Sequence, residues 1–160
     1  FSVTVNDGIY DGEIANDILY IVGTFGTVGG NSRIGVAAVN LTNGSVLSLN
    51  PSTAWSFGQF CQNSDSVYIA AAANTIYRYN ILTQAAEPLG FTFSGNVSSI
   101  ACDDDQIFLG GIGSLTINGT PMGALVKINL PGNTVDAWNP QPNSVVRDLI
   151  ISSGILYVVG

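Results

Sequence analysis

Short apolar segments alternate with polar turns along the whole chain, and four of these segments share one pattern. Each is six residues long, has an aromatic residue in its third position and ends in small or β-branched residues: "ILYIVG" (18–23), "SVYIAA" (66–71), "QIFLGG" (106–111) and "ILYVVG" (155–160). Apolar runs of this length, bounded by Gly, Asn and Ser, are typical of β-strands. Their aromatic residues lie 48, 40 and 49 residues apart, which indicates a repeating unit of that size.

The order of strands within one unit is predicted to be constant. A first strand such as "VSSIAC" (97–102) precedes the aromatic strand, and a third strand ends in Asn, as in "GVAAVN" (35–40). A fourth strand follows a Gly/Asn turn, as in "SVLSLN" (45–50) and "TVDAWN" (134–139). Asn and Gly accept the positive φ angles of tight hairpin turns. Four short antiparallel strands in each unit predict the blade of a β-propeller.

The predicted fold class is therefore all-β, a β-propeller with four-stranded antiparallel blades. About three and a half blades are expected in this chain, at about 9–53, 54–90 and 91–141, with a half blade at about 142–160. Because the sequence begins without Met and stops inside an apolar strand, we expect a piece of a longer protein, or a subunit whose last strand pairs elsewhere. Residues 1–5, "FSVTV", are expected to form either an outer strand of a preceding blade or an arm.

The connections between second and third strands differ in length between blades. Residues 23–33 and 110–123 are long excursions, whereas "AAANT" (71–75) is a tight hairpin. In a propeller these excursions emerge on the same face as the connectors 51–56 and 140–144. Variable loops on a rigid scaffold commonly carry binding sites, so this loop face is the expected contact surface for a protein or a glycan.

Composition and charge narrow the function classes. Charged residues make up only 9% of the chain, against roughly 25% in a typical soluble domain, and the net charge is −7 with four positive residues. Polyanions are bound by clustered Lys and Arg, so nucleic acid is not an expected partner. Membrane insertion is not expected either, because no apolar stretch reaches the roughly 20 residues that a membrane helix needs.

The repeat resembles the delta-sixty repeats, which form β-propellers of unknown function in bacterial and archaeal proteins. The shared pattern is an aromatic strand ending in Gly, a Phe, a Gly-Gly turn, an Arg, an Ala-rich strand, a Gly turn and a Trp-Asn-Pro ending. It falls on Tyr20, Gly23, Phe25, Gly29, Gly30, Arg33, Ala37, Ala38, Gly44, Asn50 and Pro51, and the ending recurs at Trp138, Asn139 and Pro140. Blade two lacks the Gly-Gly and the Arg, and Leu49 stands where the pattern prefers Trp.

The resemblance covers nearly everything after about residue 9 and implies a secreted or cell-surface protein without catalytic residues or cofactors. A weaker similarity of the same kind exists to fungal Rax2-type surface propellers. The repeat predicts the fold, and the resemblance adds an extracellular location to it. The resemblance suggests no ligand.

Cys61 and Cys102 lie 7 and 6 residues before the aromatic residue of their blades. They therefore take nearly equivalent places on the first strands of neighbouring blades, and a disulfide forms if their side chains face each other. Two separate buried thiols are the alternative. The extracellular location that the resemblance implies favours the disulfide.

Four Asn-X-Ser/Thr sequons are candidate glycosylation sites, and they begin at Asn40, Asn43, Asn96 and Asn118. Asn118 is the best acceptor, because it lies in the long excursion of blade three and is expected to be exposed. Asn40 and Asn43 share one turn, so they are not expected to be modified together. The alternative is that none carries a glycan, because many organisms lack the pathway.

Acidic residues gather in "CDDDQ" (102–106) and "NDGIYDGE" (6–13). Ca²⁺ takes six to eight oxygen ligands, but neither segment has the spacing of a calcium loop, so solvated acidic turns are the favoured interpretation and no metal site is assigned. Trp55 and Trp138 lie at blade ends. Packing between blades is their expected role, with a platform for stacking sugars as the alternative.

Catalysis is not favoured by the residue types present. The chain contains no His, which excludes a Ser-His-Asp triad and the usual zinc ligand within these residues. Two carboxylates are sufficient for glycoside hydrolysis, but no spacing selects such a pair. The function favoured by the sequence is a non-catalytic structural or adhesion module of a surface or filament protein. The alternative is a propeller that binds glycans or cleaves them with carboxylates. Self-association through open blade edges is also expected.

Overall fold

The structure is a computed structural model that describes residues 1–49, 58–71 and 75–160. In these ranges it contains β-strands and turns but no helix, and every strand pair is antiparallel. The strands are β1 (Ile9–Ala15), β2 (Ile18–Gly23), β3 (Thr27–Val28), β4 (Asn31–Ser32), β5 (Val36–Asn40), β6 (Gly58–Gln62), β7 (Ser66–Ala71), β8 (Thr75–Asn80), β9 (Ala86–Pro88), β10 (Phe93–Cys102), β11 (Gln106–Ile117), β12 (Thr120–Asn129), β13 (Thr134–Val135), β14 (Asp148–Ser152) and β15 (Ile155–Val159).

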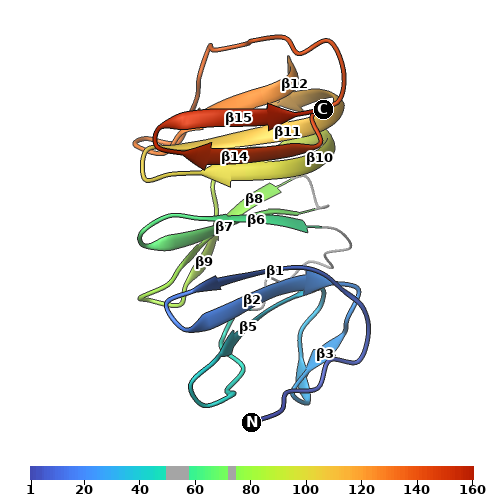
Figure 1. The fold of residues 1–160 in the computed structure, drawn as a ribbon, viewed down its shortest axis with the longest axis vertical. Coiled ribbons are helices and arrows are strands. Elements are labelled where there is room, and N and C mark those ends of the chain that lie inside the picture. The colour runs from blue at the N-terminus through green and yellow to red at the C-terminus, as the bar shows by residue number, and fades with distance from the viewer. Residues whose placement is uncertain (50–57, 72–74) are drawn as a thin grey trace.

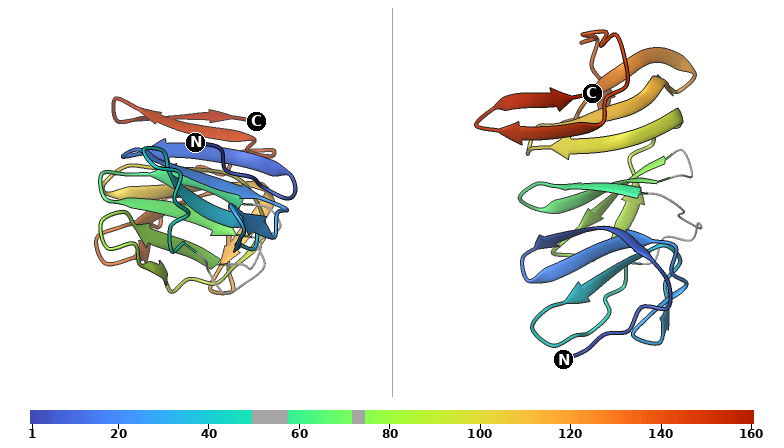
Figure 2. Two further views of the ribbon diagram at one scale, coloured as in Figure 1. Left: turned by 90° about the horizontal axis from the view of Figure 1, so that it is seen from below. Right: turned by 45° about the vertical axis from the view of Figure 1, so that its right-hand side comes forward.

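Of four sheets, the first three lie one after another along the long axis of the molecule, and the fourth lies beside sheet three (Figure 1). Sheet one has the strand order β1-β2-β5, sheet two β6-β7-β8-β9, sheet three β10-β11-β12-β13 and sheet four β14-β15. A small hairpin, β3-β4, lies beside sheet one. The right-hand view in Figure 2 shows the same succession of sheets, with β14-β15 alongside sheet three. The all-β fold and the antiparallel pairing expected from the sequence are therefore confirmed.

The first strands of the sheets face one another across each interface: β1 contacts β6, β6 contacts β10, and β10 contacts β14. Each interface is filled by apolar side chains that alternate along the strands with residues pointing to the other face. Tyr20 packs with Phe60 of the next sheet, Tyr68 with Ile100 and Phe108 with Leu149, in three separate buried clusters. The aromatic residue of the repeat is thus a core residue that joins one sheet to the next.

Steric crowding explains why two of the aromatic segments end in glycine. Gly23, at the end of β2, has the backbone carbonyl of Gly8 where a Cβ would lie. Gly160, in the equivalent place after β15, has the carbonyl of Val145 there. In both units the segment that leads into the first strand therefore crosses directly over the end of the second. Any larger residue would push these two backbone segments apart.

Two segments differ in detail from the sequence-based expectation, and a third follows one of two expected alternatives. The predicted fourth strand of blade one is reduced to a single bridge between Val39 and Val46. Of the two alternatives for residues 1–5, the structure has the arm, because Val5 bridges to Val28 and the carbonyl of Thr4 accepts a hydrogen bond from Gly29. The excursion 110–123 is a hairpin that continues β11 and β12, with the Asn118-Gly119 turn at its tip.

Candidate functional site

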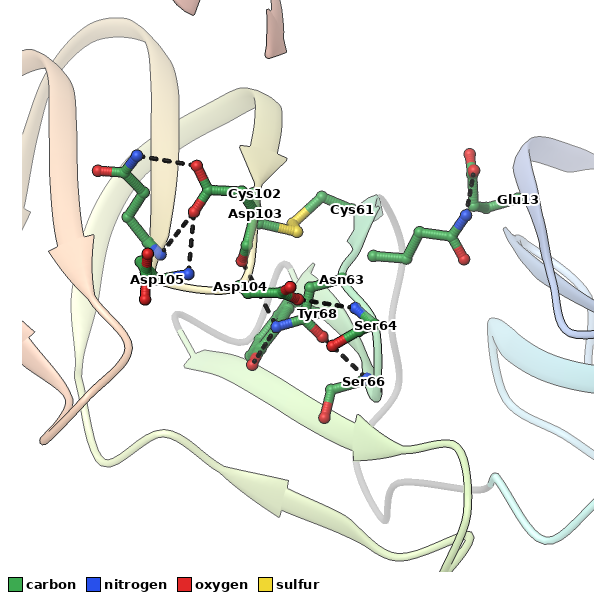
Figure 3. The surroundings of a disulfide bond; sticks show 12 residues. Glu13, Cys61, Asn63, Ser64, Ser66, Tyr68, Cys102, Asp103, Asp104 and Asp105 are labelled. Atoms are coloured by element: carbon green, nitrogen blue, oxygen red, sulfur yellow. Dashed lines mark hydrogen bonds between the residues drawn. A yellow bond between two sulfur atoms is a disulfide. The ribbon is translucent and has the colours of Figure 1, made fainter. Parts of the chain in front are cut away.

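The β6-β10 interface carries the one covalent link that the described chain contains. Cys61 on β6 and Cys102 on β10 form a disulfide with their Cα atoms 5.7 Å apart, and Figure 3 shows it crossing from one sheet to the next. Cys61 pairs with Tyr68 across its hairpin, whereas Cys102 pairs with Ile107. The two cysteines are thus displaced by one residue within the repeat. Because successive side chains of a strand point to opposite faces, this displacement turns them toward each other.

The residues that are equivalent to Cys61 and Cys102 in the repeat also meet at the other two interfaces. At the β1-β6 interface the amide of Gln62 donates a hydrogen bond of 3.1 Å to the carboxylate of Glu13, which Figure 3 also shows. At the β10-β14 interface Ile151 packs against the cluster that contains Ala101. A hydrogen bond, a disulfide and an apolar contact therefore occupy equivalent places. We call this pair of positions the interface pair.

The acidic turn after Cys102 uses its carboxylates within the protein. Asp103 accepts hydrogen bonds from the backbone N–H groups of Asp105 and Gln106 at 2.9 and 3.0 Å. Asp104 accepts a 2.9 Å hydrogen bond from the N–H of Ser64 in the neighbouring sheet. This bond and the Ser64 hydroxyl hold the pKa of Asp104 below its usual value. Figure 3 shows these residues beside the disulfide, so the turn closes the edge of the same interface.

The acidic residues near the chain start are spread over β1 and the segment before it. Asp7 and Asp11 accept hydrogen bonds from the N–H groups of the glycines that follow them, and Glu13 belongs to the interface pair. In the described ranges, no three His, Cys, Asp or Glu side chains come close enough together to hold a metal ion. The same ranges contain no helix long and apolar enough to cross a membrane.

The expected loop face is built from the connections at one edge of the sheets. Because Ile9 pairs with Gly23 and Asp148 with Val159, the connections that enter first strands lie at the same edge as those that leave second strands. The connectors 51–56, with Trp55, lie outside the described residues, as do Asn50, Pro51 and residues 72–74 of the blade-two hairpin.

The excursion 23–33 is held in place by residues that also carry the delta-sixty resemblance. Phe25 is buried, and the guanidinium of Arg33 donates a 2.6 Å hydrogen bond to the carbonyl of Leu47. Gly29 and Gly30 have φ angles of 54° and 76°, which favour glycine. The side chain of Asn6 accepts hydrogen bonds from Gly26 and Thr27. This excursion is a folded part of sheet one.

The excursion of blade three is equally well anchored. Leu115 and Ile117 are buried with Phe91 and Phe93 in the cluster between sheets two and three. At the tip, the side-chain oxygen of Asn118 accepts a 3.0 Å hydrogen bond from the N–H of Thr92. Asn118 is exposed, as expected, but its side chain also fixes the hairpin to the preceding segment. A glycan there would have to leave this oxygen contact intact or replace it.

The other three sequons lie in different settings. Asn96 is exposed on β10. Asn40 caps its turn, because its side-chain oxygen accepts hydrogen bonds from the N–H groups of Thr42 and Asn43. Asn43 is exposed in that turn, and its side chain accepts from Ser45. Whether any of the four sequons carries a glycan stays a prediction.

Trp138 lies at the edge of the connector 140–144. The residue is 39% exposed, and its ring packs edge-on against Phe108 with ring centroids 5.6 Å apart. The backbone N–H of Trp138 donates to Asp136, and this bond, the amide of Asn129 and the ammonium of Lys127 hold the pKa of Asp136 below its usual value. The indole packs on Phe108 and keeps part of its surface in solvent.

Sequence reasoning missed a polar contact that joins sheets three and four. Ser99 is buried, and its hydroxyl donates a 3.2 Å hydrogen bond to Asp148 while accepting a 3.0 Å bond from the N–H of Leu149. The hydroxyl of Ser98 also donates to the carbonyl of Val146. The "SS" in "VSSIAC" was the only available signal, because two hydroxyl residues interrupt an otherwise apolar first strand.

The comparisons with known proteins agree on the fold. No protein-family model matches the chain, and a search of curated proteins also finds no match. Solved structures do match. BamB from Moraxella catarrhalis superposes with a TM-score of 0.55 at 13% identity, over 92% of this chain and 38% of BamB. The computationally designed Ika8 protein gives a TM-score of 0.55 at 15% identity, over 94% of this chain and 54% of that one.

The extracellular domain of the one-component system BT4673 from B. thetaiotaomicron matches with a TM-score of 0.54 at 15% identity, over 96% of this chain and 20% of that one. The chain thus spans between a fifth and about half of the structures it resembles. BamB and BT4673 are propeller-like proteins, and the likeness identifies this chain as a propeller-like all-β fold.

Proposed function

We propose that the chain is a non-catalytic, extracellular segment of a β-propeller that serves as a structural or adhesion module. In this proposal the four sheets are blades of the delta-sixty type: sheets two and three have four strands each, sheet one has three strands and the Val39–Val46 bridge, and a fourth blade begins with β14-β15. The disulfide between Cys61 and Cys102 is the observation that carries the proposal. Structural disulfides persist in oxidising compartments and are rare in reducing ones.

The positions of the excursions support an adhesive role. The 23–33 and 110–123 excursions are fixed by buried apolar residues and by hydrogen bonds from Arg33 and Thr92. A preorganised surface loses less conformational freedom when it binds a partner than a flexible one does. The loop face is therefore suited to hold a protein or a glycan on a rigid scaffold.

A glycan is the partner that one observation favours. The indole of Trp138 is partly exposed, packs edge-on against Phe108 and lies next to the connector 140–144. A flat aromatic surface with an apolar face and a polar edge is suited to stack on a sugar ring. This glycan-binding role is the alternative to a purely structural one, and cleavage by carboxylates would require an acid pair beside it.

Expression in two compartments tests the proposal. The chain is produced with an added export signal and, in parallel, in a reducing cytoplasm, and the folded fraction is compared by near-UV circular dichroism and by mass spectrometry of the Cys61–Cys102 peptide. We expect the exported chain to be folded and oxidised, and the reduced chain to be less stable. Equal folding and stability with both thiols reduced would contradict an extracellular role.

Pull-down on insoluble cellulose and chitin separates the two roles. If the loop face binds glycans, the wild-type chain is retained and the Trp138→Ala variant is not, while the Leu82→Ala variant, changed at an exposed residue in a turn of sheet two, is retained like the wild type. If both variants are retained as strongly as the wild type, the glycan-binding alternative is ruled out.

A further inference from the structure

Two Asp-Gly pairs, one before β1 and one inside it, make the same close contact. The N–H of Gly8 donates a 2.7 Å hydrogen bond to a carboxylate oxygen of Asp7, and the N–H of Gly12 donates one of 2.9 Å to Asp11. In each pair the aspartate side chain is folded back on the peptide bond that follows it. The backbone nitrogen therefore lies beside the carboxyl carbon, which is one bond away from the oxygen that the N–H contacts. Such proximity favours an intramolecular attack.

An aspartate in this position can change the path of the backbone with water as the only co-reactant. The nitrogen of the following residue forms a bond to the side-chain carbon Cγ, and the carboxyl OH leaves with the amide hydrogen as water, which closes a succinimide ring. Water then adds to one of the two ring carbonyls. Addition at the main-chain carbonyl breaks its bond to nitrogen, so the chain continues through the side chain as isoaspartate. Glycine favours this reaction, because no Cβ shields its nitrogen and its backbone adapts to the ring.

The backbone of the two pairs differs in its freedom to close the ring. Ring closure requires rotation about the bond between Cα and the main-chain carbonyl carbon of the aspartate. Asp11 lies in β1 and pairs with Val22 of β2, so the ladder opposes this rotation. Asp7 and Gly8 precede β1 and are exposed. Neither the N–H nor the carbonyl of Asp7 forms a backbone hydrogen bond with the residues that the structure describes.

We infer that Asp7 is a modification site, which converts spontaneously to isoaspartate in the folded protein, and that Asp11 is protected from the same reaction by its strand. The two aspartates share the residue that follows them and the contact with its N–H group. Only the pairing of the backbone separates them. The water that opens the ring reaches Asp7 freely, because both Asp7 and Gly8 are exposed. The product has the mass of the original chain, so it differs from it only in connectivity.

Isomerisation at this position is expected to loosen the arm 1–5 from sheet one. On one side of Asp7, the side chain of Asn6 accepts two hydrogen bonds from backbone N–H groups of the excursion 23–33. On the other side, the carbonyl of Gly8 accepts a 3.0 Å hydrogen bond from Thr24 of the same excursion. Isoaspartate adds one backbone atom, about 1.5 Å of chain, between these two anchors. The added length displaces one anchor from the excursion.

Incubation in heavy-oxygen water tests the inference. The whole chain, with its native disulfide oxidised, is kept in this water at physiological pH and temperature, because every succinimide that hydrolyses takes up one heavy oxygen, whichever bond opens. Mass spectrometry of peptides gives the label at each aspartate, and electron-transfer fragmentation identifies isoaspartate. In the folded chain we expect label at Asp7 at least about tenfold faster than at Asp11. In urea, where neither is held by a strand, the two rates should be equal.

Gly8→Ala and Gly12→Ala form a matched pair of variants. The nearest atom to a Cβ at either position is an oxygen at 3.3 Å, so both variants are expected to fold. A Cβ beside the nitrogen hinders its attack. Gly8→Ala should therefore slow the labelling of Asp7 in the folded chain severalfold, whereas Gly12→Ala should leave it unchanged.

The results that support and overturn the inference are distinct. Label and isoaspartate at Asp7, at the expected ratio to Asp11, support it. A smaller ratio in the folded chain, or an unlabelled Asp7 once the urea-unfolded chain is fully labelled, would overturn it. Amide hydrogen exchange of the isoaspartate fraction tests the loosening of the arm. The amides of Gly26 and Thr27, which donate to Asn6, should exchange faster than in the fresh chain, and unchanged protection would show that the arm stays in place.

Discussion

Cys61 and Cys102 lie one residue out of register in the repeat, and this offset is what turns their side chains toward each other between β6 and β10. Had both cysteines occupied the same repeat position, they would have pointed to the same side of their sheets, so only one of them would have faced the interface between β6 and β10. The disulfide therefore reports how the sheets are stacked. The polar contact between Glu13 and Gln62 shows the same offset at the preceding interface.

Replacing both cysteines by alanine is expected to destabilise the fold. The disulfide closes a loop with a sequence separation of 41 residues, for which the chain-entropy model gives a loss of about 4 kcal/mol, with 2–4 kcal/mol as the common experimental range. The free energy of unfolding in urea, measured for the oxidised wild type and for the Cys61→Ala, Cys102→Ala variant, checks this. The wild type under reducing conditions serves as the control and should lose a similar amount. A difference below about 0.5 kcal/mol would contradict the expected role of the bond.

Ser99→Ala is expected to loosen sheet four from sheet three. The substitution removes the hydroxyl that accepts a hydrogen bond from the N–H of Leu149 and donates one to Asp148, while the Leu149 N–H keeps its 2.9 Å bond to the Asp148 carboxylate. The loss of such hydrogen bonds costs about 0.5–1.5 kcal/mol each. Amide hydrogen exchange at Leu149 should become faster, and the free energy of unfolding should fall by that amount. Ser45→Ala, at an exposed turn, is the control and should change neither. Unchanged protection of the Leu149 amide would show that the Ser99 contact does not hold the sheets together.

Tyr20 is expected to make the protein less stable in alkali. Its buried hydroxyl has no hydrogen-bond partner among the residues that the structure describes, and burial, followed by the charge of the neighbouring Tyr79, raises its pKa well above the ordinary value. Below pH 10 the phenol is neutral in both the folded and the unfolded state. Above pH 10 the unfolded state loses the proton while the folded state keeps it, so stability falls by about 1.4 kcal/mol for each further pH unit until the folded-state pKa is reached.

The Tyr20→Phe variant isolates this effect. Because the hydroxyl has no partner to lose, the variant should be as stable as the wild type at pH 8, or slightly more stable. At pH 11 it should be the more stable of the two by about 1 kcal/mol. Urea unfolding of both proteins at the two pH values gives the comparison. Equal sensitivity of both proteins to alkali would mean that Tyr20 is not the buried phenol described here.

The strand periodicity was sufficient to predict the sheets, because each buried aromatic residue stands in a short apolar segment bounded by turn residues. The spacing of Tyr20, Tyr68, Phe108 and Tyr157 corresponds to one strand in each of the four sheets. The fourth strand of blade one was not predictable in the same way. Val46 bridges to Val39, and the rest of the segment is held by side chains and not by a strand ladder, because Leu49 is buried in the cluster that contains Tyr20.

The candidate site was predictable only in part. The spacing of Cys61 and Cys102 brought them to neighbouring first strands, but which face each side chain takes depends on the hairpin turns, and a one-residue shift reverses it. The contact of Ser99 with Asp148 depends on two strands 49 residues apart, and no local pattern marks it. The long excursion 110–123 was expected to be a loop, because its glycines resemble turn residues. In the structure they occur within and between strands that Leu115 and Ile117 anchor to the core.

A second disulfide engineered at the first interface tests the central claim, that the sheets stack in one repeated register. Glu13→Cys with Gln62→Cys places cysteines at the positions equivalent to Cys61 and Cys102. We expect the oxidised four-cysteine variant to contain the bonds 13–62 and 61–102, identified by mass spectrometry of peptides, and to resist urea better than the wild type. The control, Glu13→Cys with Gln59→Cys, should leave the new thiols free, because Gln59 is on the strand face that points to sheet three. Free thiols in the first variant, or scrambled bonds such as 13–102, would contradict the stacked register.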